Sequence, residues 1–576
     1  MRNAEIAAAL SELGTLYELD GAVRYRVIAY REAARVIRDS PVSVEELARD
    51  GRATELPGVG KTLQEKIVAL LDTGSIPAAE KLKEKFPPSL VEVTLVPGLG
   101  AKTARRLYDE LGIASLEQLR EAAESGELRG VKGLGRKAEE NVLKAVARHE
   151  EEGVAERRLL SDALSVAEEI AASLRESPAA GEVTVAGSAR RMAETCKDID
   201  LIATTTDAEA LAAELAAHSL SAEPRAGGDT AARIVTHNGI TVDLRIAAPE
   251  EYGNLLQHFT GSAEHNVKLR ERAVARGLSV SEHGIKEVES GAVALCATEE
   301  EVYDRLGLPY IEPELREGGG EIKAAGEGAL PKLVTEDDIR GDLHCHTTLS
   351  DGHNSLEEMT EAARERGYSY LAVTDHSASH GFGNDVPPEA LLERVEEVRE
   401  LNRRTRGLKL LAGTETNILP DGSLDYEDEV LSELDWVIAS VHTAFRTSER
   451  KMTERVIAAI EHPLVDCIGH LTGRMILRRR PYDIDVERVA AAAAENGTML
   501  EINGNPNRRD LSEQNARLAA ELGVTIVINT DAHRVRTMEN MRYGVATARR
   551  AWLTPKQIAN TRGWREFAKL RKRAKR

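Results

Sequence analysis

Residues 183–202 read VTVAGSARRMAETCKDIDLI, and this stretch decides the fold of the middle of the chain. A short apolar strand leads into Gly187 and Ser188, a short helix is expected next, and a second strand carries Asp198 and Asp200. Because side chains at i and i+2 of a strand face the same side, the two carboxylates should converge while Ile199 enters the core. Helical runs alternate with β-like runs across residues 151–245, which predicts an α+β domain.

A third carboxylate, Asp243, lies in the strand-like run 240–245 and is expected beside the other two. Three carboxylates at one place repel each other unless cations lie between them. Two Mg²⁺ or Mn²⁺ ions would use this geometry to activate a 3′-hydroxyl and stabilise a departing pyrophosphate. Gly187 and Ser188 at a helix start would hold a triphosphate, and Arg191 would neutralise charge there. A lone Asp-x-Asp pair is often only a surface strand, but the combined spacing favours nucleotidyl transfer.

This segment resembles the palm of family X DNA polymerases, the group that includes polymerase beta. The following residues HFTGS at 258–262 resemble that family's nucleotide-binding turn, which is usually Tyr-Phe-Thr-Gly. This chain has His258 in place of the tyrosine, so sugar discrimination by that ring is not implied. The resemblance implies a nucleotide-binding subdomain at 246–316 whose contacts with nucleotide and template come from His258, Phe259, Gly261, Asn266 and Arg270.

Three short glycine-rich turns occur before residue 150, where apolar residues otherwise recur at helical spacing. They read LPGVG at 56–60, VPGLG at 96–100 and VKGLG at 131–135. Each turn would aim the N–H groups of the next helix at a phosphate, as in a helix-hairpin-helix motif that grips DNA without reading its sequence. Ordinary helix-helix turns are the alternative, which three copies disfavour. The predicted DNA contacts are Gly58, Gly60, Gly98, Gly100, Gly133 and Gly135, with nearby charge from Lys61, Lys102, Arg136 and Lys137.

The first helical region, 1–80, resembles the lyase domain of polymerase beta, and 81–150 then forms a second helix-hairpin-helix domain. Lys66 matches the Schiff-base lysine of that lyase domain, and Arg26 and Tyr30 fall near its 5′-phosphate pocket. A lyase lysine must be partly desolvated to be a free amine near pH 7. A phosphate-contacting or simply exposed lysine therefore remains an alternative.

Beyond a glycine-rich stretch at 317–338, which predicts a linker, short apolar runs alternate with helical segments from 339 to 576. Seven of these runs have polar residues at their carboxyl ends, which only a barrel of parallel strands brings to one mouth. Six imidazoles and three carboxylates suit zinc, manganese or iron better than magnesium alone. The nine candidate ligands are His344, His346, Asp351, His376, Glu415, His442, His470, Asp531 and His533.

This set resembles the PHP (polymerase and histidinol phosphatase) domain, a distorted (β/α)7 barrel. The resemblance implies three metal ions that activate water against a phosphodiester, with Glu415 bridging two of them. It groups His344, His346 and Asp531 on one ion, His442 and His470 on another, and Asp351, His376 and His533 on the third. Arg474 is a plausible phosphate contact or a surface arginine.

Composition sets further limits. The formal net charge is −20, which lowers the expectation of DNA binding without excluding it, because local patches decide recognition. No run reaches the ~18 apolar residues of a membrane span, and no signal-peptide pattern begins the chain. The four cysteines lack paired spacing, which predicts reduced thiols in a cytoplasm.

The order of these segments resembles that of bacterial family X polymerases. The resemblance predicts a monomeric DNA-directed DNA polymerase that fills short gaps in repair, with gapped or nicked DNA and deoxynucleoside triphosphates as partners. It also predicts that the barrel acts as a 3′-5′ exonuclease with Mn²⁺. Two alternatives stay open: a DNA-binding repair scaffold with inactive pockets, and a polymerase fused to a small-molecule phosphatase.

Overall fold

A computed structural model of the chain describes residues 1–94, 96, 99–131, 134–135, 139, 142–143, 157–228, 230–379 and 385–572. The chain divides into two compact units. The first consists of Met1–Arg157, Ser165–Val185 and Lys197–Ala247, and the second of Arg158–Leu164, Ala186–Cys196 and Ala248–Arg576. In the described part, no helix combines the length and apolar character needed to cross a membrane.

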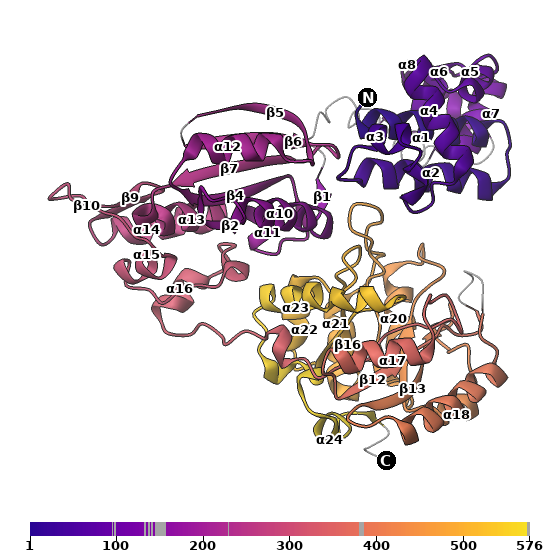
Figure 1. The fold of residues 1–576 in the computed structure, drawn as a ribbon. Coiled ribbons are helices and arrows are strands. Elements are labelled where there is room, and N and C mark those ends of the chain that lie inside the picture. Colours follow the sequence, from indigo (N-terminus) through magenta and orange to yellow (C-terminus); the bar gives the residue numbers. More distant parts are fainter. Residues whose placement is uncertain are drawn as a thin grey trace. The chain divides into compact units, whose positions relative to one another are not determined.

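The first unit begins with an all-helical region, drawn in indigo in Figure 1. Apolar residues at helical spacing on the first helix, such as Ile6, Leu10 and Leu13, are fully buried in its core. The Asn3 side chain donates to the carbonyls of Ser40 and Val42, which fixes this helix to the turn after the second one. The helices are α1 (Asn3–Leu19), α2 (Arg24–Asp39), α3 (Val44–Arg49), α4 (Lys61–Thr73), α5 (Pro77–Lys83), α6 (Pro88–Val93), α7 (Ala101–Leu111) and α8 (Leu116–Ser125).

The rest of the first unit is a five-stranded sheet with strand order β2-β4-β7-β6-β5. Strands β4 and β7 are parallel, whereas the other neighbours are antiparallel. The strands are β2 (Ala180–Val185), β4 (Asp198–Thr205), β5 (Ser221–Gly228), β6 (Ala231–Thr236) and β7 (Thr241–Ala247), with helices α10 (Leu160–Arg175) and α12 (Ala208–Ala217). The α+β prediction for this region is confirmed.

The second unit contains the segment expected to bind the nucleotide. Its elements are β1 (Arg158–Leu159), α11 (Gly187–Arg190), β3 (Thr195–Cys196), α13 (Tyr252–Thr260), α14 (Ala263–Val274), β8 (Leu278–Ser281), β9 (Gly284–Glu287), β10 (Val293–Ala294) and α15 (Glu299–Arg305). Fully buried Tyr303 and Leu306 anchor the core of this segment.

The stretch 317–338, predicted to be a linker, is folded over its first half, so that part of the prediction is wrong. It contains helix α16 (Glu321–Gly326), and Ile322 and Ala325 pack in the core just described. The glycines there serve tight turns, because Gly318 and Gly320 have φ of +74° and +107°. A Cβ at Gly318 would also lie 2.5 Å from the side chain of Glu264.

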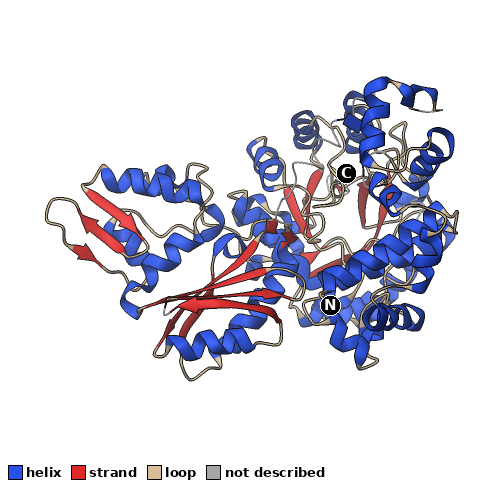
Figure 2. Ribbon diagram, turned by 90° about the horizontal axis from the view of Figure 1, so that it is seen from above, coloured by secondary structure: helices blue, strands red, loops and turns tan. Residues whose placement is uncertain are grey.

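The C-terminal part is a barrel of seven parallel strands in sequence order, which confirms the predicted barrel. A parallel bridge between Cys345 and Ala532, just beyond the first and last strands, nearly closes it. Figure 2 shows the short strands surrounded by helices. The strands are β11 (Gly341–Asp342), β12 (Tyr370–Val373), β13 (Lys409–Asn417), β14 (Trp436–Ser440), β15 (Cys467–Ile468), β16 (Met499–Asn503) and β17 (Ile526–Asn529). The helices are α17 (Leu356–Glu365), α18 (Pro388–Arg404), α19 (Asp428–Ser432), α20 (Glu449–Glu461), α21 (Val486–Asn496), α22 (Glu513–Glu521), α23 (Met541–Arg550) and α24 (Trp564–Phe567).

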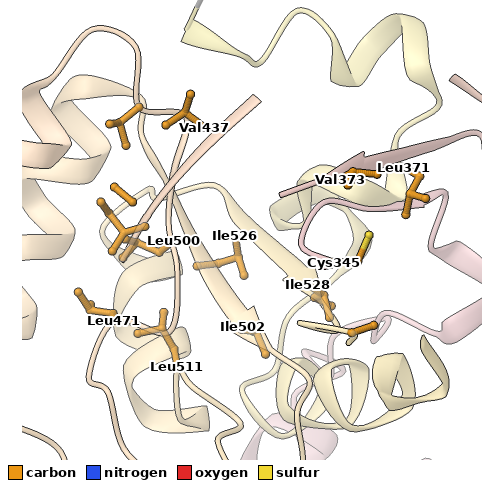
Figure 3. Close-up of a cluster of buried hydrophobic side chains, with 14 of the residues drawn as sticks. Cys345, Leu371, Val373, Val437, Leu471, Leu500, Ile502, Leu511, Ile526 and Ile528 are labelled. Atoms are coloured by element: carbon orange, nitrogen blue, oxygen red, sulfur yellow. The ribbon is translucent and has the colours of Figure 1, made fainter. Parts of the chain in front are cut away.

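Strand residues alternate between two apolar clusters. Leu371 and Val373 belong to the cluster that the strands form with the helices, part of which Figure 3 draws. Tyr370 and Ala372 belong instead to a second cluster. This cluster also contains residues on, or directly after, each of the other six strands, together with Phe567 of α24. The strands are therefore buried on both sides, as expected of a parallel barrel, and α24 contributes to the inner core.

Candidate active sites

The three acidic residues of the sheet come together in the first unit. Asp198 and Asp200 lie on β4, and Asp200 is the direct neighbour of Asp243 on parallel strand β7. Ile199 is fully buried on the opposite side of β4. Since paired parallel strands lie ~4.8 Å apart, Asp200 and Asp243 are neighbours across the two strands, and Asp198 lies on the same face of β4.

An arginine on the neighbouring strand balances part of this negative charge. Arg233, opposite Asp243 on β6, donates from Nε to Asp243 Oδ1 at 2.5 Å. That hydrogen bond and the charge of Asp243 raise the pKa of Arg233, and Asp198 and Asp200 add to the shift. All three carboxylates therefore act on this guanidinium.

The predicted nucleotide-binding turn lies in the second unit and is held by its own polar contacts. Asn266 donates to the carbonyl of His258 at 2.8 Å and accepts from Gln257 at 2.9 Å. Gly261 has φ of +64° directly after α13, which a side chain would strain. Burial lowers the pKa of His258, an effect that Glu282 opposes and Arg270 reinforces. Asn266 thus shapes the turn, and Arg270 adds charge near it.

Arg191 joins the same turn from the segment 186–196. Its Nη1 donates to the carbonyl of Thr260 at 2.5 Å and its Nε to Glu317 at 2.9 Å. Gly187, with φ of +62°, begins the short helix α11, on which Ser188 is half-buried. Phe259 packs edge-on against the His258 ring. The second unit therefore gathers Arg191, His258, Phe259, Gly261, Asn266 and Arg270 at one turn.

The three glycine-rich turns share one backbone hydrogen bond between described residues. The amide of the fourth turn residue donates to the carbonyl of the first in each copy, at 3.0 Å, 2.9 Å and 3.0 Å. Gly60 and Gly100 immediately precede α4 and α7, and Gly58, Gly60, Gly100 and Gly135 are exposed. Gly98, Gly133, Arg136 and Lys137 lie outside the described residues. The described glycines thus leave the turns open to a backbone from outside.

Lys66, the candidate lyase residue, is half-buried on α4. Arg26 stacks over the ring of Tyr17 at 4.1 Å, and Tyr30 lies against the same ring. These contacts make a compact aromatic and basic group, while the role of Lys66 itself remains an expectation.

The barrel gathers all nine candidate ligands around Glu415 at the carboxyl end of its strands. Glu415 Oε2 lies 3.0–3.7 Å from the imidazole nitrogens of three histidines, and Oε1 lies 2.9–3.4 Å from those of two others. These histidines are, in that order, His344, His346, His376, His442 and His470. A carboxylate whose two oxygens each face imidazoles is placed to bridge two cations.

The remaining ligands complete three groups, in each of which the donor atoms lie within 4.8 Å of one another. The groups are His344 with His346 and Asp531; His346 with Asp351, His376 and His533; and His376 with Glu415 and His442. The first matches the predicted grouping, and the second adds His346 to the predicted third one. The acidic side chain of Asp351 is 36% exposed and the ring of His533 30%, whereas the other ligand side chains are at most 7% exposed, so the cluster opens to solvent on their side.

Burial and charge keep two of the imidazoles and the central carboxylate in metal-binding form. Burial lowers the pKa of His346 to about 4, helped by His533 and His376, and it also lowers that of His442 to about 4. Both rings are therefore neutral near pH 7. Burial opposes the charge of Glu415, but the surrounding imidazoles hold its pKa well below the usual value. Neutral imidazoles and ionised carboxylates are the forms that ligate metals.

Among the residues that the structure describes, several buried ligand atoms of the cluster have no hydrogen-bond partner. They are His344 Nε2, His346 Nε2 and both carboxylate oxygens of Glu415. Because buried polar atoms are costly when unpaired, this pattern indicates a site built for cations. The residues present fit divalent transition-metal ions.

The sequence did not single out the residues that orient these ligands. Glu501 on β16 accepts from His344 Nδ1 at 2.7 Å and from the His470 amide at 2.8 Å. Burial lowers the pKa of His344, but the charges of Glu501, Glu415 and Asp531 together outweigh this effect and raise that pKa well above 6.5. Asn417 contacts His442 Nδ1 at 3.2 Å. Such contacts leave Nε2 of each ring for a metal. The only sequence signal for Asn417 is its position two residues after Glu415 on the same strand, which puts both side chains on one face.

Arg474, the candidate phosphate contact, is engaged by the protein. It donates to both carboxylate oxygens of Glu194 and to the carbonyls of Arg508 and Arg509. A phosphate would have to displace these contacts. Arg508 lies nearer the cluster, with Nε 3.7 Å from Asp531 Oδ2.

Four family models match the chain. A helix-hairpin-helix domain matches residues 1–76, and a SAM-like helix-hairpin-helix tandem matches residues 90–148. The DNA polymerase beta thumb matches residues 255–317, and the PHP domain matches residues 342–505.

Two kinds of curated protein are similar to the chain. The DNA polymerase/3'-5' exonuclease PolX of Bacillus subtilis (strain 168) is 36% identical over 575 residues, which is 100% of both chains. A probable phosphatase of Thermoanaerobacter sp. (strain X514) is 35% identical over 233 residues, covering 38% of this chain and 89% of the relative. A probable phosphatase of Shewanella sp. (strain MR-4) is 36% identical over 202 residues, covering 33% of this chain and 75% of the relative.

Proposed function

Since this chain belongs to the family of the DNA polymerase/3'-5' exonuclease PolX, we propose that it extends DNA primers at the sheet carboxylates and removes 3′-terminal nucleotides at the barrel cluster. The observation that carries the proposal is the set of nine donors around Glu415, in a chain that matches this relative over its whole length.

In the barrel, His344, His346, Asp351, His376, Glu415, His442, His470, Asp531 and His533 would hold up to three ions, with Mn²⁺, Zn²⁺ or iron as candidates. Bound divalent ions would acidify a water and offset the charge of the phosphodiester. Glu501 and Asn417 orient their histidines so that Nε2 faces the centre. The exposed side at Asp351 and His533 is the route by which a DNA 3′ end reaches the cluster.

In the sheet, Asp198, Asp200 and Asp243 would hold two Mg²⁺ or Mn²⁺ ions and displace Arg233 from Asp243 in part. Gly187, Ser188 and Arg191 would hold the triphosphate of a deoxynucleotide, and the turn at 258–262 its sugar and base. The exposed glycine-rich turns support binding of gapped or nicked DNA through its backbone. A repair role in filling short gaps follows from this combination.

A 5′-deoxyribose-phosphate lyase activity at Lys66 is an extension that rests on the resemblance of the helical domain. Borohydride trapping of an abasic-site DNA on wild type, but not on Lys66→Ala, would support it.

We place the protein in the cytoplasm as a monomer; its four cysteines form no disulfide, which fits a reducing compartment.

The test separates the two sites by cross-inactivation. A 5′-labelled primer on a one-nucleotide-gapped duplex is incubated with Mg²⁺ or Mn²⁺, with and without deoxynucleotides. His344→Ala should abolish shortening and keep extension, while Asp198→Ala should do the reverse. Shortening that survives His344→Ala would remove the exonuclease assignment from the barrel, and the absence of both activities in wild type would leave an inactive scaffold.

A second candidate for the barrel is a small-molecule phosphatase, favoured by the probable phosphatases that match this region. The rates of hydrolysis of histidinol phosphate and of a single-stranded oligonucleotide should be compared at equal enzyme concentration. Faster turnover of the small ester would favour the phosphatase.

A further inference from the structure

The loop at 473–481 follows the candidate ligand His470 and is rich in arginine. It lines a hollow of about 450 Å³ together with Glu194, whose charge Arg474 already neutralises. Pockets of this size accept small ligands such as a nucleotide. The other basic side chains of the loop are Arg478, Arg479 and Arg480.

Two of these arginines present uncompensated charge. Arg478 and Arg480 are exposed, and among the residues that the structure describes neither forms an ion pair. Most exposed arginines of the barrel helices, by contrast, pair with a carboxylate, as Arg403 does with Glu400. In a chain of net charge −20, two unpaired cations on the loop that lines a hollow favour an anionic partner.

An aromatic surface lies next to these charges. Phe445, on the loop after candidate ligand His442, stacks on Tyr482 with ring centroids 5.9 Å apart and planes at 14°. The guanidinium of Arg479 lies 4.4 Å from the centre of the Phe445 ring, and its Nε donates to the Gly473 carbonyl at 2.9 Å. Exposed Arg479, lying over the half-buried Phe445 ring, thus offers a planar guanidinium of the kind on which nucleic acid bases stack.

This surface is continuous with the candidate metal cluster. The amide of Ile476 donates to the carbonyl of Asn507 at 2.7 Å, which fixes the loop to the one that carries Arg508. Arg508 Nε lies 3.7 Å from Asp531 Oδ2, inside the cluster. After burial, the charge of Arg508 is the main influence that lowers the pKa of Arg479, so the two guanidiniums are close. Positive charge therefore runs from the ligands out along the loop.

We propose that Arg478, Arg479, Arg480 and Arg508, with the ring of Phe445, hold the backbone and a base of the DNA strand whose 3′ end enters the barrel. The inference rests on the proposed exonuclease function and names the surface that makes a polynucleotide, rather than a small phosphate ester, the preferred substrate. Arg508 meets the phosphate next to the scissile one, and the loop meets those further along the strand.

The test is a substrate comparison on the full chain with Mn²⁺. Wild type, Arg478→Ala/Arg480→Ala and Arg478→Lys/Arg480→Lys are assayed on a thymidine hexanucleotide and on bis(p-nitrophenyl) phosphate. The matched control is Arg406→Ala/Arg565→Ala, which removes two exposed arginines, one just before β13 and one on α24, away from the carboxyl ends of the strands.

Each lost charge-assisted contact is worth roughly 10-fold, so the alanine pair should raise KM for the hexanucleotide by about 100-fold without an equal loss on the small diester. In a plot of log KM against log salt concentration, the slope for the alanine pair should be smaller by about 1.4, because each contact with a single-strand phosphate contributes about 0.7. The lysine pair, which keeps the charge, should retain most of the slope, and the control should match wild type. A hexanucleotide KM in the alanine pair equal to that of the control would overturn the proposal.

Failure of the proposed function gives a different result. If wild type hydrolyses bis(p-nitrophenyl) phosphate but does not shorten the hexanucleotide, the exonuclease function is wrong. The binding surface is then tested separately with a fluorescent hexanucleotide. Equal binding to wild type and to the alanine pair would overturn the surface as well. If both substrates lose activity in parallel in both loop variants, the arginines serve the fold and the proposal is overturned.

Discussion

The acidic site of the sheet and the nine-donor cluster of the barrel solve the same electrostatic problem in opposite ways. In the sheet, three half-buried carboxylates lie on one face, and Arg233 balances part of their charge. In the barrel, Glu415 is buried among imidazoles, and Glu501 and Asn417 hold the rings in place. The sheet site is therefore completed by what binds it, whereas the barrel site is preorganised by the fold.

This difference predicts that removing one central ligand disables the barrel more completely than any neighbouring change. Glu415→Gln keeps the size of the side chain but removes the charge that both groups of imidazoles face. Exonuclease activity should fall by about 10³-fold, since bound metals supply several kcal/mol to such reactions. Metal content per chain, measured by mass spectrometry, should fall with it while primer extension persists. Glu495→Gln, exposed on α21, is the control; wild-type metal content in Glu415→Gln would refute a bridging role.

Orientation of the ligands should matter less than the ligands themselves. In Glu501→Gln, one oxygen becomes an NH₂ that would face the donor nitrogen of His344 or of His470. Loss of such an orienting partner typically costs about 10–100-fold in metal affinity or activity. Competition with a fluorescent chelator measures the affinity. An unchanged affinity would mean that the strands alone fix the rings, and the preorganisation argument would fail.

The barrel could be predicted because one sequence pattern, an apolar run that ends in a polar residue, indicates both a strand and a ligand. Each apolar run, such as 370–374 or 524–530, becomes a strand, and its polar residue lies at the carboxyl end. Parallel closure then forces those ends together, whatever the loops between them do. For this reason all nine donors meet in the structure.

Contacts that depend on register or on tight turns could not be predicted. Arg233 meets Asp243 only because β6 and β7 pair at that offset, and no local pattern encodes the offset. The glycines at 318–320 read as a flexible linker, whereas they form turns around buried Glu321 and Ile322. Glycine content alone does not separate flexibility from tight packing.

A buried histidine outside both sites sharpens the comparison, because it serves structure rather than metal binding. His265 contacts Glu321 Oε1 at 2.7 Å and the Tyr303 hydroxyl at 3.0 Å. Burial lowers its pKa, although the hydrogen bond to Glu321 opposes this. The ring is therefore neutral when folded, donating from Nδ1 to Glu321 and accepting at Nε2 from Tyr303.

The sign of the pH effect follows from that lowered pKa. Below the unfolded value of about 6.5, the unfolded chain binds a proton that the folded chain does not, so stability is lost as pH falls through the folded pKa. Wild type should lose at most about 1.4 kcal/mol per pH unit there, and His265→Gln should lack this part of the dependence. Melting temperatures at pH 7.5, 6.5 and 5.5 give the comparison. A constant difference between wild type and variant would show that His265 has the same pKa in the folded and unfolded states.

The smallest expected effect tests the open character of the sheet site. Arg233 is 45% exposed at its side chain and competes with divalent ions for Asp243. An exposed ion pair is worth about 0–1 kcal/mol, so Arg233→Gln should lower the Mg²⁺ concentration for half-maximal primer extension by up to ~5-fold. The control is Arg225→Gln on the neighbouring strand β5, which removes the same charge next to Arg233. This variant should change the Mg²⁺ concentration for half-maximal extension less. An increased Mg²⁺ requirement in Arg233→Gln would mean that the arginine supports the bound state, and the sheet site would then be preorganised in the same sense as the barrel.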